Sequence, residues 1–176
     1  MAWVKGKIGK SPVVLPSGDT LGGLVGLYLK FTVVLILFHL TIYSSFPEFY
    51  TNLAPLVCLE NDYLKLFGLF LMTISFLIIL IAQTTMQASW RIGIDESQKT
   101  KLVETGIFKL SRNPIYLGII LLLFGYFFIS PDEITLLIAV LGYTLSHFQI
   151  RLEEEFLEKI HGEDYLGYKR RVRRLI

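Results

Sequence analysis

Residues 114–150 read PIYLGIILLLFGYFFISPDEITLLIAVLGYTLSHFQI, and this stretch decides the fold. Two apolar segments, 114–129 and 134–150, flank the short polar run Ser130-Pro131-Asp132-Glu133. A proline followed by an aspartate that can cap the next helix favours a tight turn. Each segment approaches the roughly 17 to 20 apolar residues that a helix needs to cross about 30 Å of hydrocarbon. The stretch therefore predicts an antiparallel hairpin of membrane-spanning helices.

The composition of the whole chain also favours a membrane protein. Of its 176 residues, 53% are hydrophobic and only 18% are charged. A water-soluble domain of this length has too little interior to bury so much apolar surface, and the apolar segments lack the polar stripe of a water-facing helix. We therefore expect one all-α integral membrane domain over residues 1–176 rather than a soluble helical bundle. Its four transmembrane helices are expected at 21–43, 66–86, 114–129 and 134–150.

The distribution of lysine and arginine predicts the orientation in the membrane. Residues 44–62 and the turn at 130–133 contain neither, whereas the first 20 residues and the segments 87–113 and 151–176 are basic. Basic segments stay on the cytoplasmic side of a membrane. We therefore expect both termini in the cytoplasm, in the plasma or inner membrane of a prokaryote or the endoplasmic reticulum of a eukaryote.

The two basic segments that flank the hairpin should converge on its cytoplasmic face. Arg112 precedes Pro114, whose missing N–H costs nothing in the first turn of a helix. Taken alone, Arg112 could be an ordinary cytoplasmic anchor. The three glutamates at 153–155 directly continue an apolar helix, so at least one of them must point back toward the protein.

The last part of the chain predicts a cytoplasmic amphipathic helix. Gly162 is a typical helix terminator, and Glu163 and Asp164 favour the start of a following helix. That helix would continue through the basic tail, with apolar residues at helical spacing: Tyr165, Tyr168, Val172 and Leu175. Basic amphipathic helices bind anionic lipid surfaces, so membrane lipids are the expected partner of the tail and nucleic acid is not.

Several familiar reaction centres are missing from the sequence. It has no HExxH zinc motif, no Cys/His metal spacing, no Ser/His/Asp set and no glycine-rich phosphate loop. We therefore expect no metal site, and the single Cys58 excludes an internal disulfide. His39 lies inside an apolar segment and is expected to be a packed or hydrogen-bonded helix residue. His147, at the cytoplasmic end of the fourth span, could face a pocket.

The C-terminal half resembles a known enzyme family. The matching residues are Leu102-Val103, Gly106, Phe108, Arg112-Asn113-Pro114, Tyr116 and Gly118 before the hairpin, and Glu153-Glu154, Leu157, His161-Gly162, Tyr165, Tyr168 and Arg171-Val172 after it. In their spacing they resemble the isoprenylcysteine carboxyl methyltransferase family and its bacterial and archaeal relatives, which include phospholipid methyltransferases. The two N-terminal spans match this family only as generic membrane helices.

The resemblance implies a membrane methyltransferase that uses S-adenosylmethionine and acts on a lipophilic small molecule, with no obligatory protein partner. Carried over by position, the cofactor contacts are Thr100, Lys101, Leu102, Val103, Phe108, Asn113, Pro114, Ile115, Tyr116, Glu153 and Glu154. The catalytic candidates are Arg112, His147 and Gln149. Arg112 would bind the carboxylate of the cofactor or clamp Glu154 across the hairpin.

Three positions depart from the family pattern. Asn113 replaces the usual histidine, Phe108 replaces a tyrosine, and Gln149 replaces the arginine thought to meet a substrate carboxylate. A neutral glutamine cannot replace that arginine, so we expect a neutral or cationic acceptor rather than a prenylcysteine carboxylate. His147 could take the proton of the acceptor, or it could only pack at the interface.

Two other functions remain open at the level of sequence. Membrane sterol reductases that bind NADPH share part of the pattern, although they lack the paired glutamates at 153 and 154. A non-enzymatic membrane protein for assembly or lipid binding, with a decayed site, is the second alternative. Binding of S-adenosylmethionine distinguishes a methyltransferase from both.

The predicted topology can be tested with compartment reporters fused at Asn52 and at Ile176. We expect opposite compartments, because residues 44–62 lack lysine and arginine whereas the C-terminal segment is basic. The measurement is reporter activity in cells that express each fusion at similar levels. The same compartment for both fusions would contradict the four-span arrangement.

Overall fold

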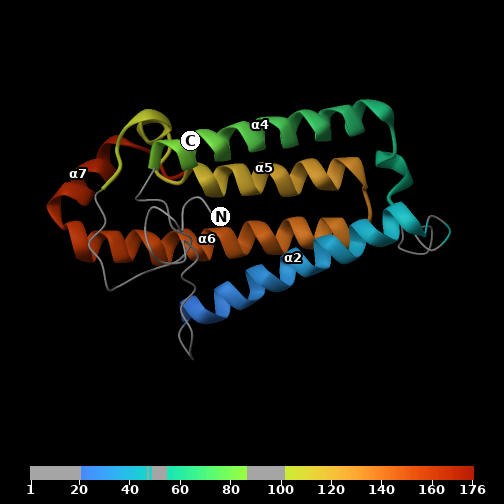
Figure 1. Ribbon diagram of the computed structural model, residues 1–176, viewed down its shortest axis with the longest axis horizontal. Helices are drawn as coiled ribbons and strands as arrows, with labels where there is room; N and C mark the ends of the chain where they lie inside the picture. Colours follow the sequence, from blue (N-terminus) through green and yellow to red (C-terminus); the bar gives the residue numbers. More distant parts are fainter. Residues whose placement is uncertain (1–20, 47, 49–54, 87–101) are drawn as a thin grey trace.

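The computed structural model describes residues 21–46, 48, 55–86 and 102–176, and these residues form helices without a β-strand. The helices are α2 (Leu21–Ser45), α4 (Asp62–Met86), α5 (Pro114–Ile129), α6 (Glu133–His161) and α7 (Glu163–Arg171), with the short 3₁₀ helices η1 (Val57–Leu59) and η3 (Gly106–Lys109) (Figure 1). Figure 1 shows α4 lying along α5, while α2 crosses beside α6. The expected all-α class is confirmed for the described residues.

Two of the described helices, α4 and α6, are long and apolar enough to cross a membrane. The Lys30–Ser45 part of α2 and all of α5 are apolar but shorter. Large apolar side chains on α4 face outward, with Phe70 57% and Phe76 60% exposed. A soluble protein rarely exposes such continuous apolar surface, because water penalises it. The chain is therefore a membrane protein, while four crossings remain a prediction.

Small residues bring α4 and α5 into close antiparallel contact. Gly68 and Ser75 lie on the facing side of α4, seven residues apart, opposite Gly125 and Gly118 of α5. A Cβ atom on Gly125 would lie 2.7 Å from the carbonyl oxygen of Gly68. The Ser75 hydroxyl donates to the Gly118 carbonyl at 2.6 Å. In lipid, where apolar burial gives little driving force, such close backbone approach is what holds helices together.

The turn between α5 and α6 has the predicted aspartate cap. The Asp132 carboxylate accepts a hydrogen bond from the Thr135 backbone N–H at 2.8 Å, and the Thr135 side chain accepts one from the Asp132 N–H. Ser130 also donates to the carboxylate, at 3.1 Å. The tight hairpin expected from residues 130–133 is therefore confirmed.

His39 of α2 joins the same buried cluster. Its Nε2 lies 2.8 Å from the Asp132 carboxylate and its Nδ1 lies 2.7 Å from the Tyr126 hydroxyl. Burial alone would raise the pKa of Asp132, but hydrogen bonds from His39 and the Thr135 N–H outweigh it and hold this pKa below its usual value. His39 is 1% exposed. The expected packed, hydrogen-bonded role of His39 is confirmed, and it attaches α2 to the hairpin.

The C-terminal segment differs from the expected long amphipathic helix. Gly162 ends α6 with a positive φ of 55°, and Glu163 and Asp164 begin α7, as predicted. However, α7 ends at Arg171, and Val172 is extended because the backbone beyond it pairs elsewhere. The carbonyl of Arg173 accepts a hydrogen bond from the Arg112 N–H at 3.0 Å. The prediction that Val172 and Leu175 continue a helix was wrong.

The close packing of α4 on α5 can be tested by comparing a glycine in the contact with a glycine outside it. Gly125→Ala should lower stability by about 1–3 kcal/mol, because the new methyl group forces the helices apart. Gly167→Ala in α7 is the control, since its Cβ would meet only the Arg171 Nη1 atom at 3.6 Å. It should raise stability by about 0.5–1 kcal/mol through helix propensity. Thermal unfolding of purified protein in detergent measures both, and a destabilisation of equal size in the two variants would contradict this packing.

Candidate active site

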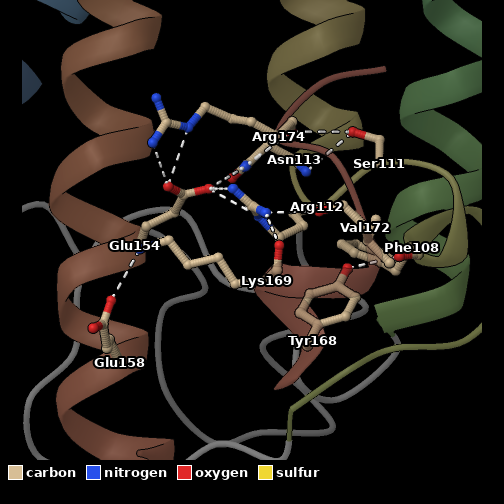
Figure 2. A network of polar contacts seen from close by, with 10 residues as sticks. All are labelled: Phe108, Ser111, Arg112, Asn113, Glu154, Glu158, Tyr168, Lys169, Val172 and Arg174. Atoms are coloured by element: carbon tan, nitrogen blue, oxygen red, sulfur yellow. Dashed lines mark hydrogen bonds and ion pairs between the residues drawn. The ribbon is translucent and has the colours of Figure 1, made fainter. Parts of the chain in front are cut away.

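The segments that precede and follow the α5–α6 hairpin meet at the carboxylate of Glu154 (Figure 2). Arg112 donates from Nε at 3.1 Å and from Nη2 at 2.8 Å to Oε1, while Arg174 donates from Nε at 3.1 Å and Nη2 at 2.8 Å to Oε2. The side chain of Arg112 is 7% exposed and that of Glu154 is 4% exposed. One buried anion is therefore held between two cations from different parts of the chain.

The remaining donors of Arg112 bind the C-terminal backbone. Its Nη1 donates to the carbonyl of Lys169 at 2.8 Å and to that of Val172 at 2.6 Å. The carbonyl of Lys169 lies in the last turn of α7, where backbone oxygens lack partners within the helix. Of the two roles expected for Arg112, clamping Glu154 is therefore the one that the geometry shows.

Asn113 contributes neutral donors to the same group. Its Nδ2 donates to the Arg174 carbonyl at 3.1 Å and lies 3.4 Å from Glu154 Oε1. The backbone N–H of Asn113 donates to the Ser111 hydroxyl at 3.1 Å. An amide satisfies a carbonyl and a carboxylate without adding a third charge. We call Arg112, Asn113, Glu154 and Arg174 the clasp.

The clasp holds the tail because the charged groups of Arg112 and Glu154 are buried. Desolvation offsets much of the attraction within a buried ion pair, so the pair as a whole adds little stability. Removing one partner is different, since it leaves an uncompensated charge and costs about 3–5 kcal/mol. The extended tail is therefore fixed against the 111–113 segment and α6.

Two buried tyrosines anchor α7 beside the clasp. The Tyr168 hydroxyl donates to the Phe108 carbonyl at 2.7 Å, and burial raises the pKa of Tyr168 to about 12. Tyr165 is 1% exposed, and burial raises its pKa well above the usual value. Phe108, an expected cofactor contact, is itself buried in η3. The tyrosine face of α7 thus packs on the protein.

A second polar group lies beside the clasp, at the facing ends of α5 and α6. The Glu153 carboxylate and the Gln149 side chain lie near the Tyr116 hydroxyl and interact with it electrostatically across the two helices. Glu153 is half-buried, Glu154 is buried, and Glu155 is exposed. The prediction that at least one of the three glutamates faces the protein is confirmed. We call Tyr116, Gln149 and Glu153 the polar triad.

The other predicted site residues are distributed around these two groups. His147 lies one turn before Arg151 on α6, where its ring packs on Tyr143 with ring centroids 4.5 Å apart. Pro114 begins α5, as expected, and Ile115 follows it half-buried. Thr100 and Lys101 lie outside the described residues.

A cavity of about 480 Å³ lies at the junction of α6 and α7. Its lining residues are Leu102, Glu104, His161, Glu163, Asp164, Gly167 and Arg171. Of the predicted cofactor contacts, Leu102 is the one that borders it. Three carboxylates line it against one arginine, Arg171, which pairs with Glu104. The excess of carboxylates suits a ligand that carries positive charge and hydrogen-bond donors.

Sequence reasoning missed Arg174, Ser111 and the carbonyls of Lys169 and Val172. The tail contains several neighbouring arginines, and spacing alone does not show which of them turns inward. Once the helix is known to end at Arg171, helical spacing no longer applies to the residues beyond it. The observed position of Arg174 therefore required the structure.

The residues that the structure describes define a helical membrane protein with a polar centre at one end of its hairpin. The family model described as phospholipid methyltransferase matches residues 63–164, which is more than half of the chain. This chain belongs to the phospholipid methyltransferase family, as its resemblance predicted. The match extends from α4 into the start of α7 and includes the polar triad. The comparisons with curated proteins and with solved structures gave no match.

The clasp predicts that lysine cannot replace Arg112. Arg112→Lys keeps the charge but cannot make four directed hydrogen bonds, so the tail should loosen and the melting temperature should fall. Arg171→Lys is the matched control, because Arg171 is 65% exposed and pairs with Glu104 at the surface. Hydrogen–deuterium exchange of residues 169–176 measures the effect. Equal tail protection in the two variants would show that the clasp does not hold the tail.

Proposed function

We propose that this chain is an S-adenosylmethionine-dependent methyltransferase that acts on a lipophilic acceptor at the cytoplasmic face of a membrane. The polar triad carries the proposal. Tyr116 belongs to the family-like stretch before the hairpin and Glu153 to the one after it, and the two side chains interact. The family match favours methyl transfer over the oxidoreductase considered above. The clasp supports the polar triad because it joins the start of α5, which carries Tyr116, to the part of α6 that carries Glu153.

The residues present fit this cofactor. Both oxygens of Glu154 are engaged by arginines, whereas the Glu153 carboxylate has no arginine against it in the described ion pairs. Glu153 is therefore available to accept hydrogen bonds from an ammonium group or a ribose hydroxyl. His161, which borders the cavity, follows Glu154 by seven residues, or about 10 Å along the helix. An elongated cationic ligand would extend from the triad toward that cavity.

The chemistry asks for positioning more than for acid–base strength. Bound S-adenosylmethionine would supply an electrophilic methyl group, which an acceptor takes up through a lone pair while the bond to sulfur breaks. The protein must align the acceptor and exclude water. Gln149 and Tyr116 would orient the acceptor, and His147, whose Nε2 has no hydrogen-bond partner, would take its proton.

The acceptor is proposed to be neutral or cationic. A carboxylate in this position needs a cationic partner, and Gln149 offers none. Arg112 and Arg174 are both committed to Glu154 and so do not substitute for the missing arginine. An amine, a thiol or another lipid-soluble nucleophile, reached sideways from the bilayer, fits the observed residues better.

Four spans with both termini in the cytoplasm complete the proposal. In that arrangement the cytoplasmic ends of α5 and α6 carry the triad and the clasp. The opposite end carries the buried His39–Asp132 pair. A water-soluble cofactor would then enter from the cytosol while the acceptor stays in the membrane.

Cofactor binding tests the proposal directly. Glu153→Ala should weaken S-adenosylmethionine binding about tenfold to a hundredfold, because a hydrogen bond to a charged group contributes roughly 1.5–3 kcal/mol. Glu155→Ala is the matched control, since the exposed Glu155 faces away from the site. Calorimetry on folded protein in detergent gives both dissociation constants. Similar losses from the two variants, or no binding by the unmodified protein, would contradict the proposed pocket.

A further inference from the structure

Buried polar atoms without a hydrogen-bond partner gather in one place. Among the residues that the structure describes, all four such side-chain atoms lie on α6 between residues 146 and 161: Ser146 Oγ, His147 Nε2, Gln149 Oε1 and His161 Nε2. Ser146 is 0% exposed and Gln149 is 3% exposed. In an apolar environment an unpaired polar atom is unfavourable, so such atoms mark a place where a ligand binds or water enters.

Ser146 is unlike the other hydroxyls on the spanning helices. Thr144, two residues earlier on α6, donates to the Val140 carbonyl at 2.8 Å, and Thr73 on α4 donates to the Leu69 carbonyl at 2.8 Å. Such bonds to the preceding turn satisfy a hydroxyl without help from other helices. Ser75 instead donates across to α5. Ser146 bonds neither to a carbonyl of the preceding turn nor to another helix, so its oxygen has no hydrogen-bond partner.

The free oxygens lie on the same face of α6 as the polar triad. Ser146, Gln149 and Glu153 are separated by three and four residues, which places them one above another along the helix. Gly142 continues this face one turn further and packs directly on Leu123 of α5. On the neighbouring faces Tyr143 and Phe148 are 43% and 49% exposed, where lipid would lie. The face therefore leads from Glu153 into the membrane-spanning part of α6.

We propose that Ser146 and Gln149 are specificity-determining residues that bind the head group of the methyl acceptor. This inference rests on the proposed methyltransferase function and adds Ser146, one turn deeper in the bilayer than Gln149. The Gln149 Oε1 atom can only accept a hydrogen bond, and the Ser146 oxygen can accept one as well. The head group is therefore one that donates at least two hydrogen bonds. A quaternary ammonium head group has the same charge but no N–H donor, so it would leave both oxygens without a hydrogen bond.

Two matched lipid-like probes test this inference: dodecylamine and dodecyltrimethylammonium. Both have one positive charge and the same chain, but only the first has N–H donors. Unmodified protein in lipid nanodiscs should bind dodecylamine at least about tenfold more tightly, since the difference is the loss of hydrogen bonds to buried oxygens. Ser146→Ala and Gln149→Met should each reduce this preference to about threefold or less. Thr144→Ala, with its locally bonded hydroxyl, should leave it unchanged.

The outcomes separate this inference from the proposed function. Equal binding of the two probes by the unmodified protein, or an unchanged preference in Ser146→Ala, would overturn the role of this face. Ser146→Ala removes a single oxygen and keeps the helix, so its result stands even where Gln149→Met does not fold. S-adenosylmethionine binding is measured on the same samples. Its absence together with intact probe preference would overturn the proposed function and leave the head-group site standing.

Discussion

The structure depends on one buried carboxylate, that of Glu154, held between Arg112 and Arg174. Removing Glu154 would leave two arginines close together without their anion, and removing Arg112 would leave the buried carboxylate to the partly exposed Arg174. Their union fixes the start of α5, the end of the α6 span and the extended tail at a single point. It also leaves the neighbouring Glu153 without an arginine partner and thus able to serve a ligand. The two adjacent glutamates thus have different roles: Glu154 holds the structure together, and Glu153 is proposed to bind the ligand.

The rest of the hairpin follows from the requirement that polar groups inside a membrane find partners within the protein. At the end opposite the clasp, Asp132 collects hydrogen bonds from His39, Ser130 and the Thr135 N–H. Between the ends, glycines allow α4 and α5 to touch backbone to backbone. Against these satisfied regions, the unpaired oxygens of Ser146 and Gln149 stand out. Because the buried polar groups in those regions are hydrogen-bonded, the unpaired oxygens of Ser146 and Gln149 indicate a binding site.

Much of this arrangement could be predicted from the sequence, because it depends on local signals. The helix-capping Asp132, the terminating Gly162 and the apolar stretches act within a few residues, and the structure has them where expected. The meeting of Arg112 with Glu154 was one of two predicted roles for that arginine. The inward turn of Arg174 could not be predicted, since it depends on where the tail leaves the helical path. Helical spacing misplaced Val172 and Leu175 because three backbone and side-chain bonds to the 111–113 segment outweigh helix propensity there.

Buried charge pins α6 at its N-cap, Asp132, and at Glu154, seven residues before its last residue, and this fixes the length of helix between the two. Residue 154 lies 22 positions after residue 132, a rise of about 33 Å, which is close to the roughly 30 Å of a hydrocarbon core. Inserting or deleting one residue would turn Glu153 and Glu154 by about 100° relative to α5 and exchange their surroundings. The protein therefore cannot adapt to a thicker or thinner bilayer by changing this helix, and must tilt or deform the lipid instead. The depth of the site relative to the lipid surface should therefore change with the thickness of the membrane.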